Sequence, residues 1–281
     1  CELAAGGTRG KTMHDAAAVG DARAITRRIE RGEHPDQKDF LSQTPLMHAA
    51  AKGKTAAVVA LLDGGADANA TDVNGRTPLH CAAVSNCGGN LGPERELPND
   101  ESNTSSDKDV SEIPSPPFVD VIHELVRRGG ARVNARDDKG FTPLHAAAES
   151  GNVAIARMLI ELGAQVDTHR AEDDATPLFL AARCGRPGMI AYLHSRGADL
   201  EALGRTSDRR EGHDTNVTPL VEAVMSDHAA AAAKLIALGA DVEAPTSWMP
   251  PLLTATLRSN PTVARMLLDE GADPRVGVGG V

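Results

Sequence analysis

The sequence repeats a short motif, Thr-Pro-Leu, at nearly regular intervals. Copies begin at Thr44, Thr77, Thr142, Thr176 and Thr218, and residues 250–252, Pro-Pro-Leu, form a degenerate copy. The successive spacings are 33, 65, 34, 42 and 32 residues. A second motif, Gly-Ala followed by Asp, Arg or Gln, recurs in step at residues 65–67, 130–132, 163–165, 197–199, 239–241 and 271–273. Two motifs in one period indicate a stack of similar units, each burying its apolar face against its neighbours.

Each unit carries the signals of two short helices. Thr can cap a helix start, and Pro suits the first helical position because the N–H there has no intrahelical partner. An Ala-rich stretch follows, and a glycine ends it in four units, at Gly20, Gly53, Gly151 and Gly185. A second stretch has apolar residues at helical spacing, and the Gly of the Gly-Ala motif suits its left-handed end. We therefore expect an all-α fold of about seven helix-turn-helix units with short β-hairpin loops.

These features resemble the ankyrin repeat, whose pattern is a β-hairpin, Thr-Pro-Leu-His, two antiparallel helices and Gly-Ala-Asp-Val-Asn-Ala. Residues 67–70 read Asp-Ala-Asn-Ala and residues 133–135 read Val-Asn-Ala, close to the end of that pattern. The resemblance covers residues 11–275 and leaves tails at 1–10 and 276–281. It implies a solenoid that binds a protein or peptide partner in its concave groove, as an adaptor, effector or regulatory subunit.

The composition is typical of closely stacked helices and argues against two classes of binding partner. The 281 residues include only one Trp, one Tyr and four Phe, few for a sandwich or a globular α/β core. The formal charge of -10 repels phosphate backbones and anionic lipids, so neither nucleic acid nor membrane is expected as a partner. The four cysteines show no CxxC pairing, which favours reduced thiols in a cytoplasmic or nuclear setting. Because residue 1 is Cys, we expect a fragment or a processed product.

Two segments depart from the regular period. An inserted loop at 85–117 is rich in Gly, Ser, Pro and acidic residues, so we expect it to project between two helices of one unit. It is either a tolerated surface insertion or a regulatory flap. An extended hairpin at 203–213 reaches beyond the others. It either contacts a bound partner or reflects simple drift in loop length.

The groove residues follow from the repeat geometry. In ankyrin-type stacks, positions on both sides of the Ala pair of the first helix face the groove, and the hairpins form its rim. We predict partner contacts at Phe40, His48, Lys52, Arg76, Phe141, Glu149, Arg183, Glu222, Trp248 and Arg258. A mixed surface of charged and apolar residues is typical of protein-binding faces. Arg183 lies between two acidic positions, which predicts either a charge ladder or an Arg that awaits a carboxylate of the partner.

The histidines divide into two groups. His14, His80 and His145 occupy the His position of the motif, where an imidazole braces neighbouring hairpins. Met47 fills that position in the second unit, and His48 follows it at the groove position. His48 is therefore the histidine most suited to a functional role.

One arrangement suggests an alternative function. Asp15, His48 and Cys81 are spaced 33 residues apart, in an order that resembles an acid, a base and a nucleophile. A variable surface produces such a trio without catalysis, and no oxyanion feature accompanies it. We find no phosphate-binding Gly loop, no HExxH and no zinc spacing, so no metal or cofactor is expected. The sequence favours a binding module, with an unusual enzyme or small-molecule binder on the groove as the alternative, and a purely structural spacer as the third.

Overall fold

The computed structural model describes residues 12–84, 117–207, 214–244 and 249–275. Within these ranges fourteen α-helices form seven pairs, and the helices are joined by loops and one two-stranded sheet. The predicted all-α class and the number of helix pairs are confirmed. The chain divides into two compact units. Unit 1 is Cys1–Ser85 with Ser115–Asp137, and unit 2 is Asn86–Pro114 with Asp138–Val281.

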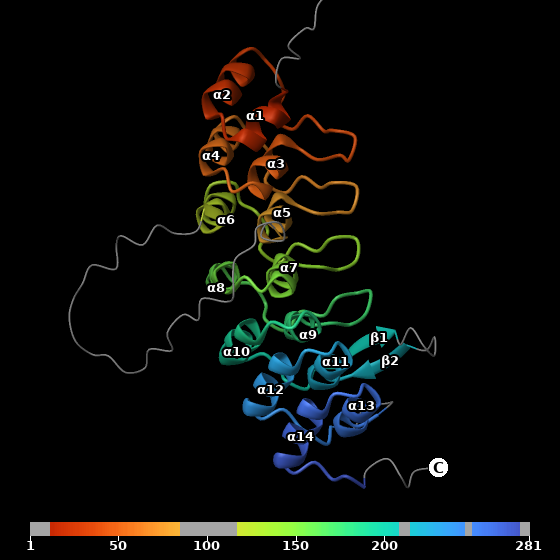
Figure 1. Ribbon diagram of the computed structural model, residues 1–281. Helices are drawn as coiled ribbons and strands as arrows, with labels where there is room; N and C mark the ends of the chain where they lie inside the picture. The colour runs from red at the N-terminus through yellow and green to blue at the C-terminus, as the bar shows by residue number, and fades with distance from the viewer. Residues whose placement is uncertain (1–11, 85–116, 208–213, 245–248, 276–281) are drawn as a thin grey trace, which may run out of the picture. The chain divides into compact units, whose positions relative to one another are not determined.

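Unit 1 contains three helix pairs. They are α1 (Met13–Val19) with α2 (Ala22–Glu30), α3 (Pro45–Ala51) with α4 (Thr55–Asp63), and α5 (Pro78–Val84) with α6 (Pro117–Arg127). Helix α3 packs against both α1 and α5, and the second helices α2, α4 and α6 form a second row beside the first helices (Figure 1). The loops between α2 and α3 and between α4 and α5 project on the side of the first helices (Figure 1).

Unit 2 contains four helix pairs and the sheet. The pairs are α7 (Pro143–Ser150) with α8 (Val153–Glu161), α9 (Pro177–Arg183) with α10 (Pro187–Ser195), α11 (Pro219–Met225) with α12 (Ala229–Ala237), and α13 (Pro251–Leu257) with α14 (Pro261–Asp269). β1 (Gly204–Ser207) pairs antiparallel with β2 (Asp214–Val217), and Gly204 lies opposite Val217. The segment expected as an extended hairpin, 203–213, contains β1, and its residues 208–213 lie outside the described residues. None of the described helices has the length and apolarity needed to span a membrane.

The short first helices depend on capping and on tertiary packing. The Thr44 hydroxyl accepts the Met47 N–H at 3.4 Å, and the Thr176 hydroxyl accepts the Phe179 N–H at 3.2 Å. A helix of seven residues is unstable alone in water, so most of its stability comes from burial of one face. Leu46 is fully buried on α3, and the small Ala side chains of these helices allow close approach between neighbours.

The turns between helices require left-handed residues. The glycines that end the helices have positive φ angles, for example 63° at Gly53 and 91° at Gly197, as the sequence predicts. Where the last two pairs lack that glycine between their helices, Asp227 (φ 60°) and Ser259 (φ 55°) adopt the left-handed conformation instead. Non-glycine residues pay a steric cost there, and Asp is among the residues that tolerate it best.

Side-chain acceptors link successive repeats at the loops that follow the second helices. Each acceptor bonds the backbone N–H of the residue after a Gly-Ala pair in the next repeat: Asp36 with Asp67 at 3.1 Å, Asp167 with Asp199 at 3.3 Å, Glu201 with Asp241 at 2.8 Å, and Glu243 with Asp273 at 2.6 Å. Since each bond joins nearest neighbours, these bonds stabilise each stack repeat by repeat.

Candidate partner-binding surface

Three apolar side chains stand exposed on the two hairpin loops of unit 1. Phe40 is 91% exposed, Val73 54% and Leu41 42%. The Val73 N–H donates to the Leu41 carbonyl at 3.2 Å, so the two loops adjoin at this point. Contiguous apolar side chains left in water mark a contact surface more often than an accident of folding. We call Phe40, Leu41 and Val73 the apolar tip.

An aspartate holds each of these loops in shape. Asp39 Oδ1 accepts the N–H groups of Leu41 and Gln43, both at 2.9 Å. Asp72 Oδ1 accepts the Asn74 N–H at 2.9 Å in the equivalent turn. Such side-chain to backbone bonds fix the path of a loop. The apolar tip is therefore presented on preformed loops, which reduces the ordering cost of binding.

Two predicted cationic residues of unit 1 are exposed. Lys52 follows the end of α3 and is exposed. Arg76 belongs to the same loop as Val73, its side chain is 49% exposed, and its Nε lies 3.9 Å from Asp137 Oδ2. The Asp137 side chain is only 4% exposed, so this long ion pair joins a half-exposed guanidinium to a buried carboxylate.

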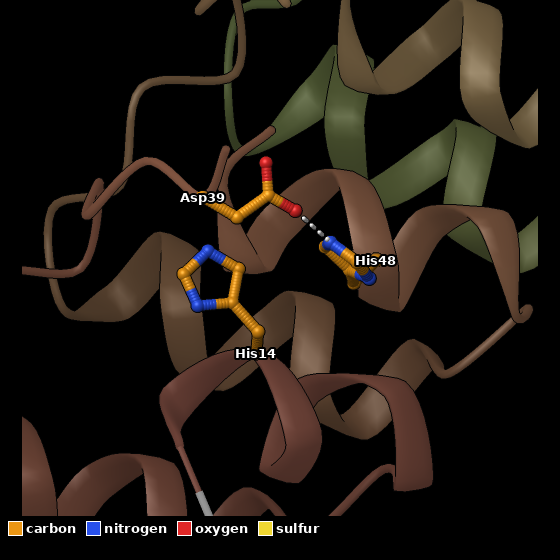
Figure 2. A group of neighbouring side chains, drawn as sticks. All are labelled: His14, Asp39 and His48. Atoms are coloured by element: carbon orange, nitrogen blue, oxygen red, sulfur yellow. Dashed lines mark hydrogen bonds and ion pairs between the residues drawn. The ribbon is translucent and has the colours of Figure 1, made fainter. Parts of the chain in front are cut away.

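His48 lies against the first hairpin loop and bonds to it. Its Nε2 is 3.0 Å from Asp39 Oδ2, and the two side chains are 31% and 18% exposed (Figure 2). Met47 is buried, so the one-residue offset from the His position does place His48 outside the core. Burial raises the pKa of Asp39, but the hydrogen bonds from His48, Gln43 and Leu41 lower it by more than burial raises it. The net pKa of Asp39 lies below its usual value, so its carboxylate is ionised at neutral pH.

His14 approaches the same group from α1. Its ring meets the His48 ring edge to face, with centroids 5.3 Å apart, and its Nε2 contacts the Gln43 carbonyl at 3.1 Å (Figure 2). In unit 2, His145 Nε2 makes the matching contact with the Ala175 carbonyl, also at 3.1 Å. Both histidines therefore brace the residue that precedes the next Thr-Pro, the role expected of this position.

The members of the suggested catalytic trio have other partners. The Asp15 carboxylate accepts the backbone N–H and the hydroxyl of Thr12, each at 2.9 Å, in a capping box at the start of α1. His48 bonds to Asp39 rather than to Asp15. Burial and the nearby Asp72 carboxylate raise the pKa of the Cys81 thiol to about 12. A thiol with so high a pKa is a poor nucleophile at neutral pH, because the thiolate is the reactive form.

Arg183 is the centre of an ionic network in unit 2. Its Nε donates to Glu222 Oε1 at 2.9 Å, its Nη1 to Asp173 Oδ2 at 3.0 Å, and its Nη2 to the Arg205 carbonyl at 3.2 Å. Of the two acidic positions that flank Arg183 in the sequence pattern, Glu222 pairs with it, and Asp173 from the preceding loop is its second carboxylate partner. Among the described residues, no ion pair joins Arg183 to Glu149.

The charges of the network differ in burial. The Glu222 side chain is 4% exposed and the Arg183 side chain 28%. Glu222 Oε2 has no hydrogen-bond partner among the described residues. Burial raises the pKa of Asp173, but hydrogen bonds from Arg170 and Arg183 lower it more. Burial lowers the pKa of Arg183, but the Glu222 and Asp173 carboxylates raise it more. Both ionised forms are therefore stabilised by the pairing.

The remaining predicted contacts fall in different places. Phe141 is half-buried, stacks on His145 with centroids 5.5 Å apart, and lies 5.7 Å from the Arg170 guanidinium carbon. Glu149 and Arg258 are exposed on unit 2. Trp248 and residues 85–116 of the predicted insertion (85–117) lie outside the described residues, and Pro117 begins α6.

Sequence reasoning missed two acidic residues that organise these sites. Asp39 binds His48, and Asp173 binds Arg183. Both lie in the hairpin just upstream of a Thr-Pro, five and three residues before the Thr. Each hairpin adjoins the helix that follows it, so an acidic residue there is a signal that could have been paired with the basic residue of that helix, His48 or Arg183.

Comparison with known proteins decides the family. A sequence model of ankyrin repeats in three copies matches residues 13–91 and 117–204, more than half of the chain. The chain belongs to the ankyrin repeat family. Ankyrin repeats are typically protein-interaction modules. The identification agrees with the helix pairs, the left-handed glycines and the bracing histidines described above.

Two sequence relatives match this chain over part of their own length, and one solved ankyrin repeat domain matches most of this chain. Ankyrin repeat protein nuc-2 of Neurospora crassa is 29% identical over 214 residues, which are 72% of this chain and 18% of that protein. The E3 ubiquitin-protein ligase XBAT32 of Arabidopsis thaliana is 30% identical over 177 residues, 60% of this chain and 33% of that protein. This chain thus spans a third or less of these relatives. The human ASB11 ankyrin repeat domain has a TM-score of 0.68 at 22% identity, covering 93% of this chain and 98% of that chain.

Proposed function

We propose that this ankyrin repeat chain binds a protein partner through its hairpin loops and first helices, the concave groove of the family, as an adaptor, effector or regulatory subunit. The apolar tip carries the proposal, because Phe40 is 91% exposed on a loop whose shape is already fixed. Complete burial of a Phe side chain contributes about 1.5–3 kcal/mol. A partner that covers the tip therefore gains a central anchor at low ordering cost.

The chemistry of unit 1 indicates what the partner offers there. An apolar segment matches Phe40, Leu41 and Val73, and an acidic group next to it matches Arg76, which shares the loop of Val73. A second acidic group matches Lys52 at the end of α3. Charges at the edge of an interface act mainly on association rate and specificity, whereas buried apolar anchors supply the affinity. We assign the anchor to the apolar tip and specificity to the two cations.

Unit 2 contributes differently. Because Arg183 is bonded to Glu222 and Asp173, we assign these residues to holding α9, α11 and the adjoining loop in place. The exposed residues Glu149 and Arg258 remain candidates for direct contact.

The proposal is tested by affinity capture from extracts of the source cells. The test variant carries Phe40→Ser and Val73→Ser, and the matched control is Leu268→Ser, which removes a 47% exposed apolar side chain from α14. Exposed substitutions of this kind change the free energy of unfolding by about 0.5 kcal/mol or less, so all three chains stay folded. A protein captured by wild type and control but lost from the tip variant supports the proposal. Equal capture by all three chains contradicts it.

A further inference from the structure

Three side chains from separate elements of unit 1 converge on one point. His14 comes from α1, Asp39 from the loop before α3, and His48 from α3 (Figure 2). One ligand atom from each lies within 4.8 Å of the other two. Two imidazoles and a carboxylate form a donor set that binds divalent transition metals, including Zn²⁺. We propose that His14, Asp39 and His48 form a binding site for a divalent transition-metal ion, with Zn²⁺ as the test ion.

The spacing of the ligand atoms is close to that of a metal site. Zn–N and Zn–O bonds of about 2.0–2.2 Å in a tetrahedron place neighbouring ligand atoms about 3.4 Å apart. Asp39 Oδ2 and His48 Nε2 are 3.0 Å apart, so they need to separate only slightly. His14 needs to approach by at most about 1.4 Å, which a rotation of its side chain provides.

Backbone groups already orient the carboxylate. Asp39 Oδ1 is held by the Leu41 and Gln43 N–H groups, which leaves Oδ2 directed at His48. Outer hydrogen bonds of this kind fix the orientation of metal ligands and raise affinity. Asp39 therefore does not have to be ordered when the ion binds.

Metal binding would break two hydrogen bonds, and the groups that lose them would gain other partners. The ion would replace the hydrogen bond between His48 and Asp39, because both side chains would then bind the metal. His14 Nε2 contacts the Gln43 carbonyl, and that carbonyl also accepts the Asp39 N–H at 3.0 Å. The Gln43 carbonyl thus keeps a donor if His14 turns towards the ion. Neither change leaves a buried polar group without a partner.

The site is open to solvent. The His48 side chain is 31% exposed and the Asp39 side chain 18%, so an ion can reach them. Three protein ligands leave the fourth position of a tetrahedral ion for water, as in open zinc sites. Because α1 and α3 belong to the first and second helix pairs, the bound ion cross-links two successive repeats. Metal binding therefore stabilises the folded state of unit 1.

Among the described residues, this is the one place where three His, Cys, Asp or Glu side chains bring ligand atoms this close together. One repeat later, 33 residues on, the corresponding positions hold Met47, Asp72 and Cys81. These three positions keep the carboxylate but have neither imidazole. The metal site is therefore a local addition to the repeat. It adjoins the proposed partner-binding surface, because Asp39 also holds the loop that carries Phe40 and Leu41.

The test is Zn²⁺ titration of the full chain after removal of metal with a chelator, followed by calorimetry and by competition with a chromophoric indicator. We expect one saturable high-affinity Zn²⁺ per chain and a higher melting temperature on binding. His14→Gln, Asp39→Asn and His48→Gln should each weaken the affinity by at least about 10-fold, since even outer-shell changes cost about 10–100-fold. Asp39→Asn retains an oxygen for the two backbone N–H groups, so its loop stays intact.

The matched control is His169→Gln. His169 and Asp174 form an exposed pair in unit 2, with Nδ1 and Oδ1 3.3 Å apart. Loss of that histidine should leave the affinity and the melting shift unchanged. The proposal is overturned if Zn²⁺ shows no saturable 1:1 binding, or if any of the three cluster variants binds as tightly as the control.

Discussion

Arg183 Nε donates to Glu222 Oε1 at 2.9 Å and so joins α9 to α11, the first helices of two successive repeats. The Glu222 side chain is 4% exposed, and a carboxylate at that depth needs a counter-charge to offset its lost hydration. Asp173 binds the same guanidinium from the loop before α9. A single arginine thus ties together two helices and a loop of unit 2.

Removal of Arg183 is expected to destabilise the chain strongly. Arg183→Ala leaves Glu222 buried without a counter-charge, which costs about 3–5 kcal/mol in comparable pairs. The measurement is the free energy of unfolding in urea. Arg258→Ala removes an exposed arginine and should change that value by about 0.5 kcal/mol or less. Equal, small losses for both variants would show that Glu222 does not depend on Arg183.

One of the side-chain acceptors that link successive repeats, Glu201, gives a pH-dependent prediction. Burial and the negative charges of Asp241 and Asp199 raise the pKa of Glu201 above its usual 4.5, although the Asp241 N–H lowers it. Ionisation therefore costs more in the folded chain than in the unfolded chain. The protonated Glu201 carboxyl therefore favours the folded chain. Its contribution to the free energy of unfolding is fully present below the usual pKa and is lost as pH rises through the folded pKa.

Glu201→Gln isolates this effect because the amide oxygen still accepts the Asp241 N–H. At pH 7 the variant should be more stable than wild type by about a few tenths of a kcal/mol, since solvent screens a partly exposed group. The gain should vanish below about pH 4, where the wild-type carboxyl is protonated in both states. The exposed Glu270→Gln serves as control. Thermal melting from pH 3 to pH 8 measures the difference, and a gain that persists at pH 3 contradicts this account.

Two glycines of unit 2 give opposite predictions for the same substitution. Gly197 has φ 91°, and a Cβ built there meets nothing within 4 Å. Gly197→Ala should therefore destabilise through backbone strain alone, by about 1–2 kcal/mol. Gly188 lies inside α10, and its Cβ also meets nothing within 4 Å. Gly188→Ala should stabilise by about 0.5–1 kcal/mol, because Ala restricts the unfolded chain. Urea unfolding of both variants checks the signs, and equal signs refute the argument.

Cys81 should react slowly in the folded chain. Its thiol pKa is raised from 9.0 to about 12, so at pH 8 its thiolate is about 1000-fold scarcer than that of an ordinary cysteine. Iodoacetamide labelling followed by mass spectrometry should show much slower modification of Cys81 in buffer than in urea. Rapid labelling of the folded chain would restore Cys81 as a candidate nucleophile.

The repeat fold was readable from sequence because its signals are local. Thr44 caps a helix, Gly197 ends one, and each does so within a few residues of its own position. Even the shift of His48 out of the core followed from its offset by one residue from the motif. Local rules of this kind need no knowledge of the neighbouring repeat.

The sites were less predictable because they join residues across loops. Arg183 and Glu222 could be placed on neighbouring helices, but the choice between a mutual pair and two partner contacts depends on side-chain geometry. Asp39 and Asp173 act from hairpins whose path is not set by helical periodicity. The His14, Asp39 and His48 cluster lacks any local ligand spacing, since its residues are 25 and 9 positions apart.

The most direct test of partner binding is photo-crosslinking from the apolar tip in the source cells. A photoreactive phenylalanine analogue replaces Phe40 in one chain and Leu268 in the control chain, and crosslinked proteins are identified by mass spectrometry. We predict a discrete protein joined to position 40, absent from position 268, and diminished when Val73 is also changed to Ser. The same set of proteins joined to both positions, or no protein joined to position 40, would contradict the assignment of the apolar tip as the partner-binding surface.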